Sequence, residues 1–118
     1  MAGVYERLDD AGRPVADRAP VDPSERDRVI DYLKKAPVVL AARGYATDQF
    51  DPERRNAVPM TFHTDGTWIW AGAVHYYLKK YDFPPQPELL AHIRARDFVL
   101  PEVSEEAKKR AVDVITSD

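Results

Sequence analysis

The stretch Thr61-Phe-His-Thr-Asp-Gly-Thr-Trp-Ile-Trp70 decides the fold of this 118-residue chain. Its Asp65-Gly66 pair is the strongest short-range signal for a β-hairpin, because both residue types tolerate the positive φ of a tight turn. We therefore predict two antiparallel strands, over 58–63 and 67–70, joined by this two-residue turn. The turn fixes which side chains share a face of the hairpin.

A turn of this length pairs Thr64 with Thr67 and places His63 opposite Trp68. Since side chains alternate along a strand, the hairpin has two distinct faces. The more apolar face is the expected core and carries Met60, Phe62 and Ile69. The other face carries Thr61, His63, Trp68 and Trp70. A solvated face would be polar, so either another element covers the indoles or they form a recognition surface.

Helices and one more strand are predicted around the hairpin. Asp22 and Pro23 are typical of a helix start, and Ser104 is typical of an N-cap. The expected helices span about 22–36, 73–81, 87–96 and 104–116, and a buried strand spans 38–42. The fold class is therefore α+β: a small, mainly antiparallel sheet of about three strands packed by three to four helices.

The chain length indicates one domain. Residues 1–20 have little hydrophobic periodicity, so we expect a mobile N-terminal arm that docks a few apolar residues, followed by a single α+β domain over 21–118. A short strand near Val4–Leu8 is the alternative reading of this arm. The polar segment 44–57 is long enough to be a functional loop.

Composition narrows the classes of function. The chain has no cysteine, which excludes disulfides and thiolate chemistry. Its net charge of −3 gives no basic face for nucleic acid, so a nucleic-acid partner is not expected, although a C-terminal basic edge keeps an accessory role open. No segment resembles a signal peptide or a membrane span, so we expect a cytoplasmic protein with no membrane partner.

The three histidines lack the spacing of a known metal motif. His63, His75 and His92 are far apart in sequence, so no metal or other cofactor is expected. His63 with Asp65 is the best acid–base candidate, since an acid can orient an imidazole. Asp is also favoured at this turn position for its backbone geometry. We therefore assign no catalytic residue.

Aromatic residues are the remaining signal. Tryptophan and tyrosine concentrate binding energy at protein interfaces, and they also fill cores. The predicted binding residues are those of the aromatic hairpin face and the helix beside it: His63, Asp65, Trp68, Trp70, His75 and Tyr76.

Part of the chain resembles a known group of proteins. The similar part covers 58 to about 100 and contains Thr64-Asp-Gly-Thr-Trp-Ile-Trp70, Ala73-Val-His-Tyr-Tyr-Leu78 and Pro84-Pro-Gln-Pro-Glu-Leu-Leu90, followed by Ala91-His-Ile-Arg94. This pattern resembles small actinobacterial proteins of unknown function that share a T-D-G-x-W-x-W hairpin, some of them linked to polymorphic toxin and immunity cassettes. The resemblance implies a compact bacterial module that works through a protein partner, and it implies no catalytic residues.

Two hypotheses follow. The first is a non-enzymatic protein-binding or regulatory module, immunity-like in form, with self-association left open. It uses the aromatic face or the 44–57 loop. The second is a small enzyme or ligand-binding domain with a site around His63, Asp65 and His75. The first predicts an exposed apolar patch, and the second predicts a concave site with a perturbed titrating group.

Overall fold

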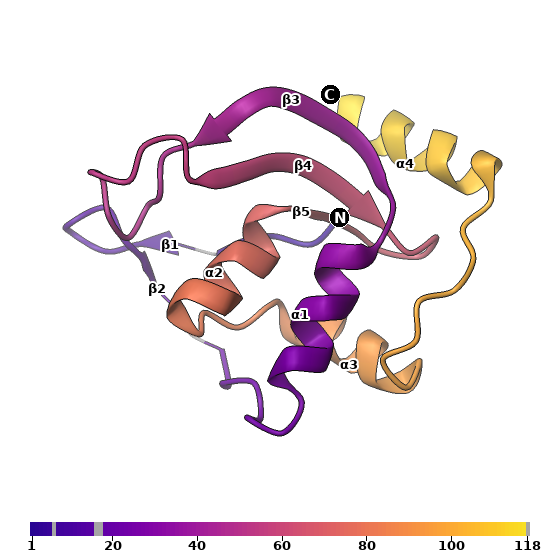
Figure 1. Cartoon of the computed structure of the whole chain (residues 1–118), viewed down its shortest axis with the longest axis horizontal. Helices are drawn as coiled ribbons and strands as arrows, with labels where there is room; N and C mark the ends of the chain where they lie inside the picture. The colour runs from indigo at the N-terminus through magenta and orange to yellow at the C-terminus, as the bar shows by residue number, and fades with distance from the viewer. Residues whose placement is uncertain (6, 16–17, 118) are drawn as a thin grey trace.

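The computed structural model describes residues 1–5, 7–15 and 18–117. Within these ranges three strands form an antiparallel sheet in the order β3-β4-β5, and two short strands form a separate ladder. The elements are, in chain order, β1 (Arg7–Leu8), β2 (Pro14–Val15), α1 (Arg26–Lys35), β3 (Val38–Ala46), β4 (Val58–Thr64), β5 (Ile69–Ala71), α2 (Ala73–Tyr81), α3 (Pro87–Ala95) and α4 (Glu105–Thr116) (Figure 1). The predicted α+β class is confirmed.

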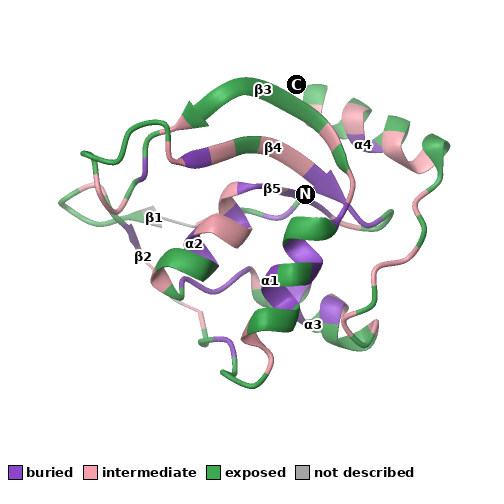
Figure 2. Cartoon of the chain, viewed as in Figure 1, coloured by how far each residue is buried: buried purple, intermediate pink, exposed green. Residues whose placement is uncertain are grey.

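The three-stranded sheet has two unlike faces. Helices α1 and α2 lie on one face, here called the inner face, and α4 lies on the opposite, outer face (Figure 1). The register pairs His63 with Trp70 on the inner face and Phe62 with Ala71 on the outer face. Burial follows the same division, because the buried residues gather between the sheet and α1, α2 and α3, whereas β3 is exposed along most of its length (Figure 2).

The hairpin register differs from the prediction. Thr64 pairs with Ile69, so four residues connect the strands rather than two. The turn is wider because Asp65 Oδ1 accepts the backbone N–H groups of Thr67 at 3.0 Å and Trp68 at 2.8 Å. Since the register moves by two residues, the alternation of faces is unchanged.

The prediction of which hairpin face is the core was wrong for Met60 and Phe62 and correct for Ile69, which is buried, while the main core cluster lies on the aromatic face. Met60 is 40% exposed, whereas Trp70 is 0% exposed. The indole of Trp70 lies 6.1 Å from the Tyr32 ring, centroid to centroid, and its Nε1–H donates to the Leu33 carbonyl at 2.9 Å. The apolar stripes of α1 and α2 therefore cover the aromatic face, and part of the other face is left open.

Helix starts depend on local capping. Helix α1 begins at Arg26, four residues later than predicted, because Asp22 caps the preceding turn by accepting the N–H and O–H of Ser24. Helix α4 begins as predicted, with Ser104 Oγ accepting the N–H of Ala107 at 3.1 Å. Both cases follow from the short side-chain oxygens that satisfy free backbone donors.

The N-terminal segment covers one edge of the sheet. The Ala2 N–H donates to the Ile69 carbonyl at 2.8 Å, and the Gly3 N–H donates to Gln86 Oε1 at 3.1 Å. Ala2 is buried, as expected of an arm that docks apolar residues. Residues 6 and 16–17 of the predicted arm lie outside the described residues, and its mobility stays a prediction. The opposite edge of the sheet is β3.

Candidate functional site

Asp65 is the centre of a buried hydrogen-bond network. Its Oδ2 accepts from Tyr32 Oη at 2.6 Å and lies 2.8 Å from His92 Nε2. Burial raises the pKa of Asp65, but hydrogen bonds from Trp68, Tyr32, Thr67 and His92 together lower the pKa below its usual value. The carboxylate is therefore charged, and both of its oxygens are hydrogen-bonded within the protein.

The histidine that pairs with Asp65 is His92, not His63 as predicted. Arg96 Nε lies 3.0 Å from the same His92 nitrogen, and Arg96 Nη2 donates to Thr67 Oγ1 at 3.1 Å. In one tautomer that nitrogen donates to Asp65, and in the other it accepts from Arg96. The cluster joins the hairpin turn to α3, so its geometry explains turn stability without any reaction.

His63 lies on the inner face, where both of its ring nitrogens are hydrogen-bonded. Its Nδ1 lies 2.9 Å from the Ala36 carbonyl and its Nε2 lies 3.0 Å from Thr61 Oγ1, so both ring nitrogens have partners. Burial lowers the pKa of His63, and the imidazole is neutral at pH 7. His63 therefore has no free nitrogen for proton transfer.

His75 is the neighbour of His63 on α2. The two ring centroids are 5.9 Å apart and the planes are perpendicular. Burial, with the charges of His63, Lys34 and Lys79 acting in the same direction, lowers the pKa of His75 to about 4. No group of three or more His, Cys, Asp or Glu side chains among the described residues could hold a metal ion.

A second buried carboxylate, Asp48, was missed by the sequence analysis. Its Oδ1 accepts the N–H groups of Phe50 at 2.7 Å and Asp51 at 3.2 Å, and its Oδ2 accepts from Tyr76 Oη at 2.7 Å and Tyr81 Oη at 2.6 Å. This bonding ties the 44–57 loop to α2. Asp followed two residues later by a backbone donor is an Asx-turn pattern, which is the signal that could have found it.

The role of Tyr76 is thereby explained. Burial, reinforced by its hydrogen bond to Asp48, raises the pKa of Tyr76 to about 12. Its hydroxyl is therefore a hydrogen-bond donor that anchors the loop, and it stays protonated at neutral pH.

None of the six predicted binding residues is exposed. His63, Asp65 and Trp70 are buried, and Trp68, His75 and Tyr76 are half-buried. Trp68 lies beside His92, with ring centroids 6.3 Å apart. The structure brings His63 and His75 together and joins Asp65 to a different histidine. The exposed aromatic face, one of the two binding surfaces that the first hypothesis offers, is therefore absent from the described residues.

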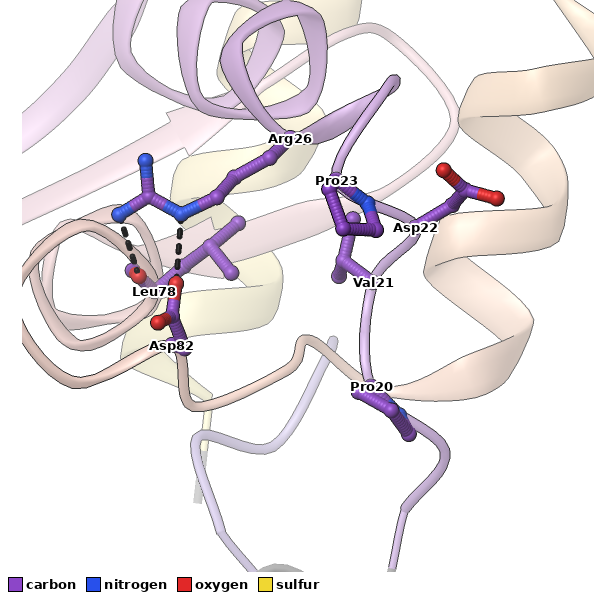
Figure 3. A pocket seen from close by; sticks show the side chains of 7 residues that line it. All are labelled: Pro20, Val21, Asp22, Pro23, Arg26, Leu78 and Asp82. Carbon is purple, nitrogen blue, oxygen red and sulfur yellow. Dashed lines mark hydrogen bonds and ion pairs between the residues drawn. The ribbon is translucent and has the colours of Figure 1, made fainter.

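A hollow of about 480 Å³ lies where the start of α1 meets the end of α2 (Figure 3). Arg26 crosses one side of it. Its Nε donates to Asp82 Oδ1 at 2.6 Å, and its Nη2 donates to the carbonyls of Lys79 at 2.7 Å and Leu78 at 3.4 Å. These carbonyls belong to the last turn of α2, where a cation satisfies unpaired backbone acceptors. Arg26 therefore stabilises a helix end.

The outer face offers a different kind of site. Leu40, Phe62 and Ala71 lie side by side across the three strands. Met60 is two residues before Phe62 on β4, so its side chain lies on the same face of the sheet. Leu40 is 36% exposed and Met60 is 40% exposed. These side chains line an open groove of about 410 Å³ whose lining residues carry no charge. We call it the outer groove. The residues that line it are Leu40, Ala41, Ala42, Pro59, Met60, Thr61, Phe62 and Ala71.

Helix α4 covers the other part of the same face. Thr64 and Ile69, one step further along the strands, lie against Ala107, Ala111 and Val114 of α4. Ala111 is the buried residue of that helix. The outer face is thus half covered, and the uncovered half is apolar.

Comparisons with known proteins find no matching family model, no matching curated protein and no matching solved structure. Among the described residues, no helix is both long and apolar enough to cross a membrane. The assignment of function therefore depends on the residues of this chain alone.

Proposed function

We propose that this chain is a non-enzymatic protein-binding module, and that its binding surface is the outer groove. The observation that carries the proposal is the row of exposed Leu40 and Met60 with half-buried Phe62, which no other described element covers. Contiguous apolar surface next to a covered region is typical of a protein interaction site.

The hydrogen bonding of the buried polar groups supports the same proposal. Among the described residues, every buried side-chain nitrogen and oxygen has a hydrogen-bond partner. Both Asp48 and Asp65 accept bonds on both of their oxygens. Catalytic groups, in contrast, need a free atom aimed at the substrate. The polar residues of this fold are used to build it.

The second candidate function is a small enzyme or ligand-binding domain around His63, Asp65 and His75. The one observation that favours it is the strongly lowered pKa of His75, since perturbed titrating groups gather at functional sites. The bonding of His63 and Asp65 weighs against it. An immunity-like role is the particular form of protein binding that the hairpin resemblance suggests, and it would make a toxin the partner.

The test is site-specific photo-crosslinking in a lysate of the source organism. A photoreactive phenylalanine analogue replaces Met60 in one variant and Lys80, an exposed residue of α2, in the control variant. We expect discrete crosslinked protein species from position 60 that are absent from position 80 and that disappear in the presence of excess unlabelled wild-type protein. Identical species from both positions, or none from position 60, would contradict the proposal.

A further inference from the structure

We propose that α4 is a detachable cover of the outer face. The helix leaves the sheet while the rest of the domain stays folded, and its departure uncovers further apolar surface beside the outer groove. The inference goes beyond the proposed function and can be tested without a partner. Three properties of α4 support it: its packing, its polar contacts and the segment that connects it to α3.

The hydrophobic packing of α4 is separate from the core of the domain. Among the described residues, the two clusters of buried hydrophobic side chains, and the partly buried ones packed against them, include no residue of α4. Ala111 is the one buried residue of this helix, which is otherwise exposed or half-buried (Figure 2). Packing stabilises in proportion to the apolar area that it buries, and an alanine buries little. The core is therefore complete without α4.

Two hollows flank α4 where it meets the sheet. One, of about 540 Å³, lies between β3 and the side of the helix that carries Lys109 and Asp113. The other, of about 240 Å³, lies between the hairpin and the side that carries Ala107 and Arg110. Close packing on all sides is what holds a helix firmly in a protein interior. The contact between α4 and the sheet lacks such packing on either side.

The polar contacts of α4 are local. Within the part of the chain that the structure describes, the hydrogen bonds and ion pairs of 104–117 all lie inside that segment, as between Lys108 and Glu105 at 3.1 Å. In contrast, an ion pair between Arg94 and Glu25 at 2.8 Å joins α3 to the start of α1. Helix α4 can therefore leave the sheet without breaking a hydrogen bond or an ion pair to the rest of the domain.

The link from α3 to α4 is anchored at its start and free at its end. Phe98 lies beneath the Arg28 guanidinium, which is 4.2 Å from the ring centroid, and Phe98 and Leu100 pack against the core cluster. Among the described residues, 101–103 form no hydrogen bond, and Pro101 has no N–H group to donate. These three residues are therefore the hinge about which α4 moves.

The departure of α4 changes the outer face. Ile69 lies under the helix and is 8% exposed. It is two residues before Ala71 on β5, so its side chain lies on the same face as the outer groove. Its exposure extends the apolar surface of the groove along the sheet. The docked helix then limits the surface that a partner reaches, and this consequence, unlike the undocking itself, rests on the proposed function.

The first experiment uses the absence of cysteine from the chain. Ala111→Cys and its matched control, Ala36→Cys, each place one thiol at a buried alanine, 4% exposed on α4 and 3% exposed at the end of α1. The rate of modification by a thiol reagent is measured in increasing urea. We expect position 111 to react roughly 100-fold faster than position 36 and with little dependence on urea, because local opening exposes little surface.

Hydrogen exchange of the wild-type protein tests the same opening without a substitution. We expect the backbone amides of 105–116 to be protected roughly 100-fold less than those of 29–35. Equal protection of the two helices, or equal thiol reaction rates at positions 111 and 36, would overturn the proposal. Weak protection of α4 with slow reaction at position 111 would mean that the helix frays while docked, and would overturn it too.

The second experiment forces α4 off the sheet with Ala111→Asp. Because the core is complete without α4, we expect the urea midpoint, followed by tryptophan fluorescence, to stay within about 0.5 M of the wild type. The matched control Ala36→Asp buries a charge in the core cluster and should lower the midpoint several-fold more. Binding of the apolar dye anilinonaphthalene sulfonate should rise in Ala111→Asp.

The outcomes of the second experiment separate the two proposals. Loss of the cooperative transition in Ala111→Asp would show that α4 is part of the core and would overturn the detachable cover. A folded variant whose dye binding equals that of the wild type would overturn it as well. A rise in dye binding, with no crosslinked species from position 60, would contradict the proposed function and leave the detachable cover standing.

Discussion

The two faces of the sheet differ both in the polarity of their side chains and in how far these side chains are buried. The inner face carries a histidine and a tryptophan, His63 and Trp70, and it is buried under α1 and α2. The outer face carries Leu40, Met60 and Phe62, and it is open beyond the end of α4. Polarity alone would assign the faces the other way round. The difference shows that the position of the helices, together with complete hydrogen bonding, decides which face becomes core.

The polar side chains of the inner face can be buried because each of them is hydrogen-bonded. A buried polar group costs free energy unless it is hydrogen-bonded. The Trp70 indole N–H reaches the last turn of α1, and His63 reaches the residue that ends that helix. The polar atoms of the inner face therefore join the sheet to α1 at defined points.

The largest expected effect is that of Trp70→Ala. The substitution leaves a cavity in the core and an unpaired Leu33 carbonyl, and we expect it to lower the free energy of unfolding by about 3–5 kcal/mol. Met60→Ala on the outer face should lower it by less than about 1 kcal/mol. Urea unfolding followed by circular dichroism measures both. Equal losses would mean that the two faces are buried to the same extent in solution.

Asp65→Asn is the next in size. The amide keeps an oxygen for the turn N–H groups, but it places an NH₂ group against two donors, Tyr32 Oη and His92. Losing hydrogen bonds to a charged acceptor should cost about 2–3 kcal/mol. Asp31→Asn, at an exposed position of α1, is the matched control and should change the free energy of unfolding by less than about 0.5 kcal/mol. A loss at position 65 no larger than that at position 31 would refute the importance of this network.

Much of the fold was predictable because local rules decide it. Helices α2 and α4 span the predicted residues within a residue at each end, since their stripes and caps are local features. The alternation of faces along 58–64 was also correct. The turn length was wrong, because Asp65 binds two backbone N–H groups and thereby widens the connection.

The site was less predictable because tertiary contacts decide it. No spacing in the sequence pairs Asp65 with His92 rather than His63, since their contact depends on how α3 docks against the turn. Asp48 likewise receives its bonds from Tyr76 and Tyr81 through the packing of α2 against the loop. The open half of the outer face depends on where α4 ends its contact with the sheet. Such placements are global, and a periodic pattern does not contain them.

The pH dependence of stability distinguishes the inner face further. The pKa of His75 is about 4 in the folded protein and about 6.5 in an unfolded chain. Between these values the unfolded state binds more protons, so the free energy of unfolding falls as the pH falls from 6.5 toward 4 and is fully regained above 6.5.

His75→Gln removes this contribution. We expect the wild type to lose roughly 1 kcal/mol more than the variant between about pH 7.5 and about pH 5, after allowing for solvent screening of a half-buried group. Urea midpoints at the two pH values measure the difference, and carboxylates affect both proteins alike. Parallel losses in the two proteins would mean that His75 is solvated in the folded state.

The smallest expected effect on stability is that of a substitution in the outer groove, in contrast to the large effect of Trp70→Ala on the inner face. Met60→Asp places a charge on a 40% exposed side chain, where it stays hydrated, so we expect the free energy of unfolding to change by less than about 0.5 kcal/mol. Crosslinking from Leu40, on the neighbouring strand, should nevertheless be lost in this variant. A destabilisation approaching that of Trp70→Ala would show that Met60 is covered in solution. The groove would then be part of a core, and the open half of the sheet would not be available to a partner.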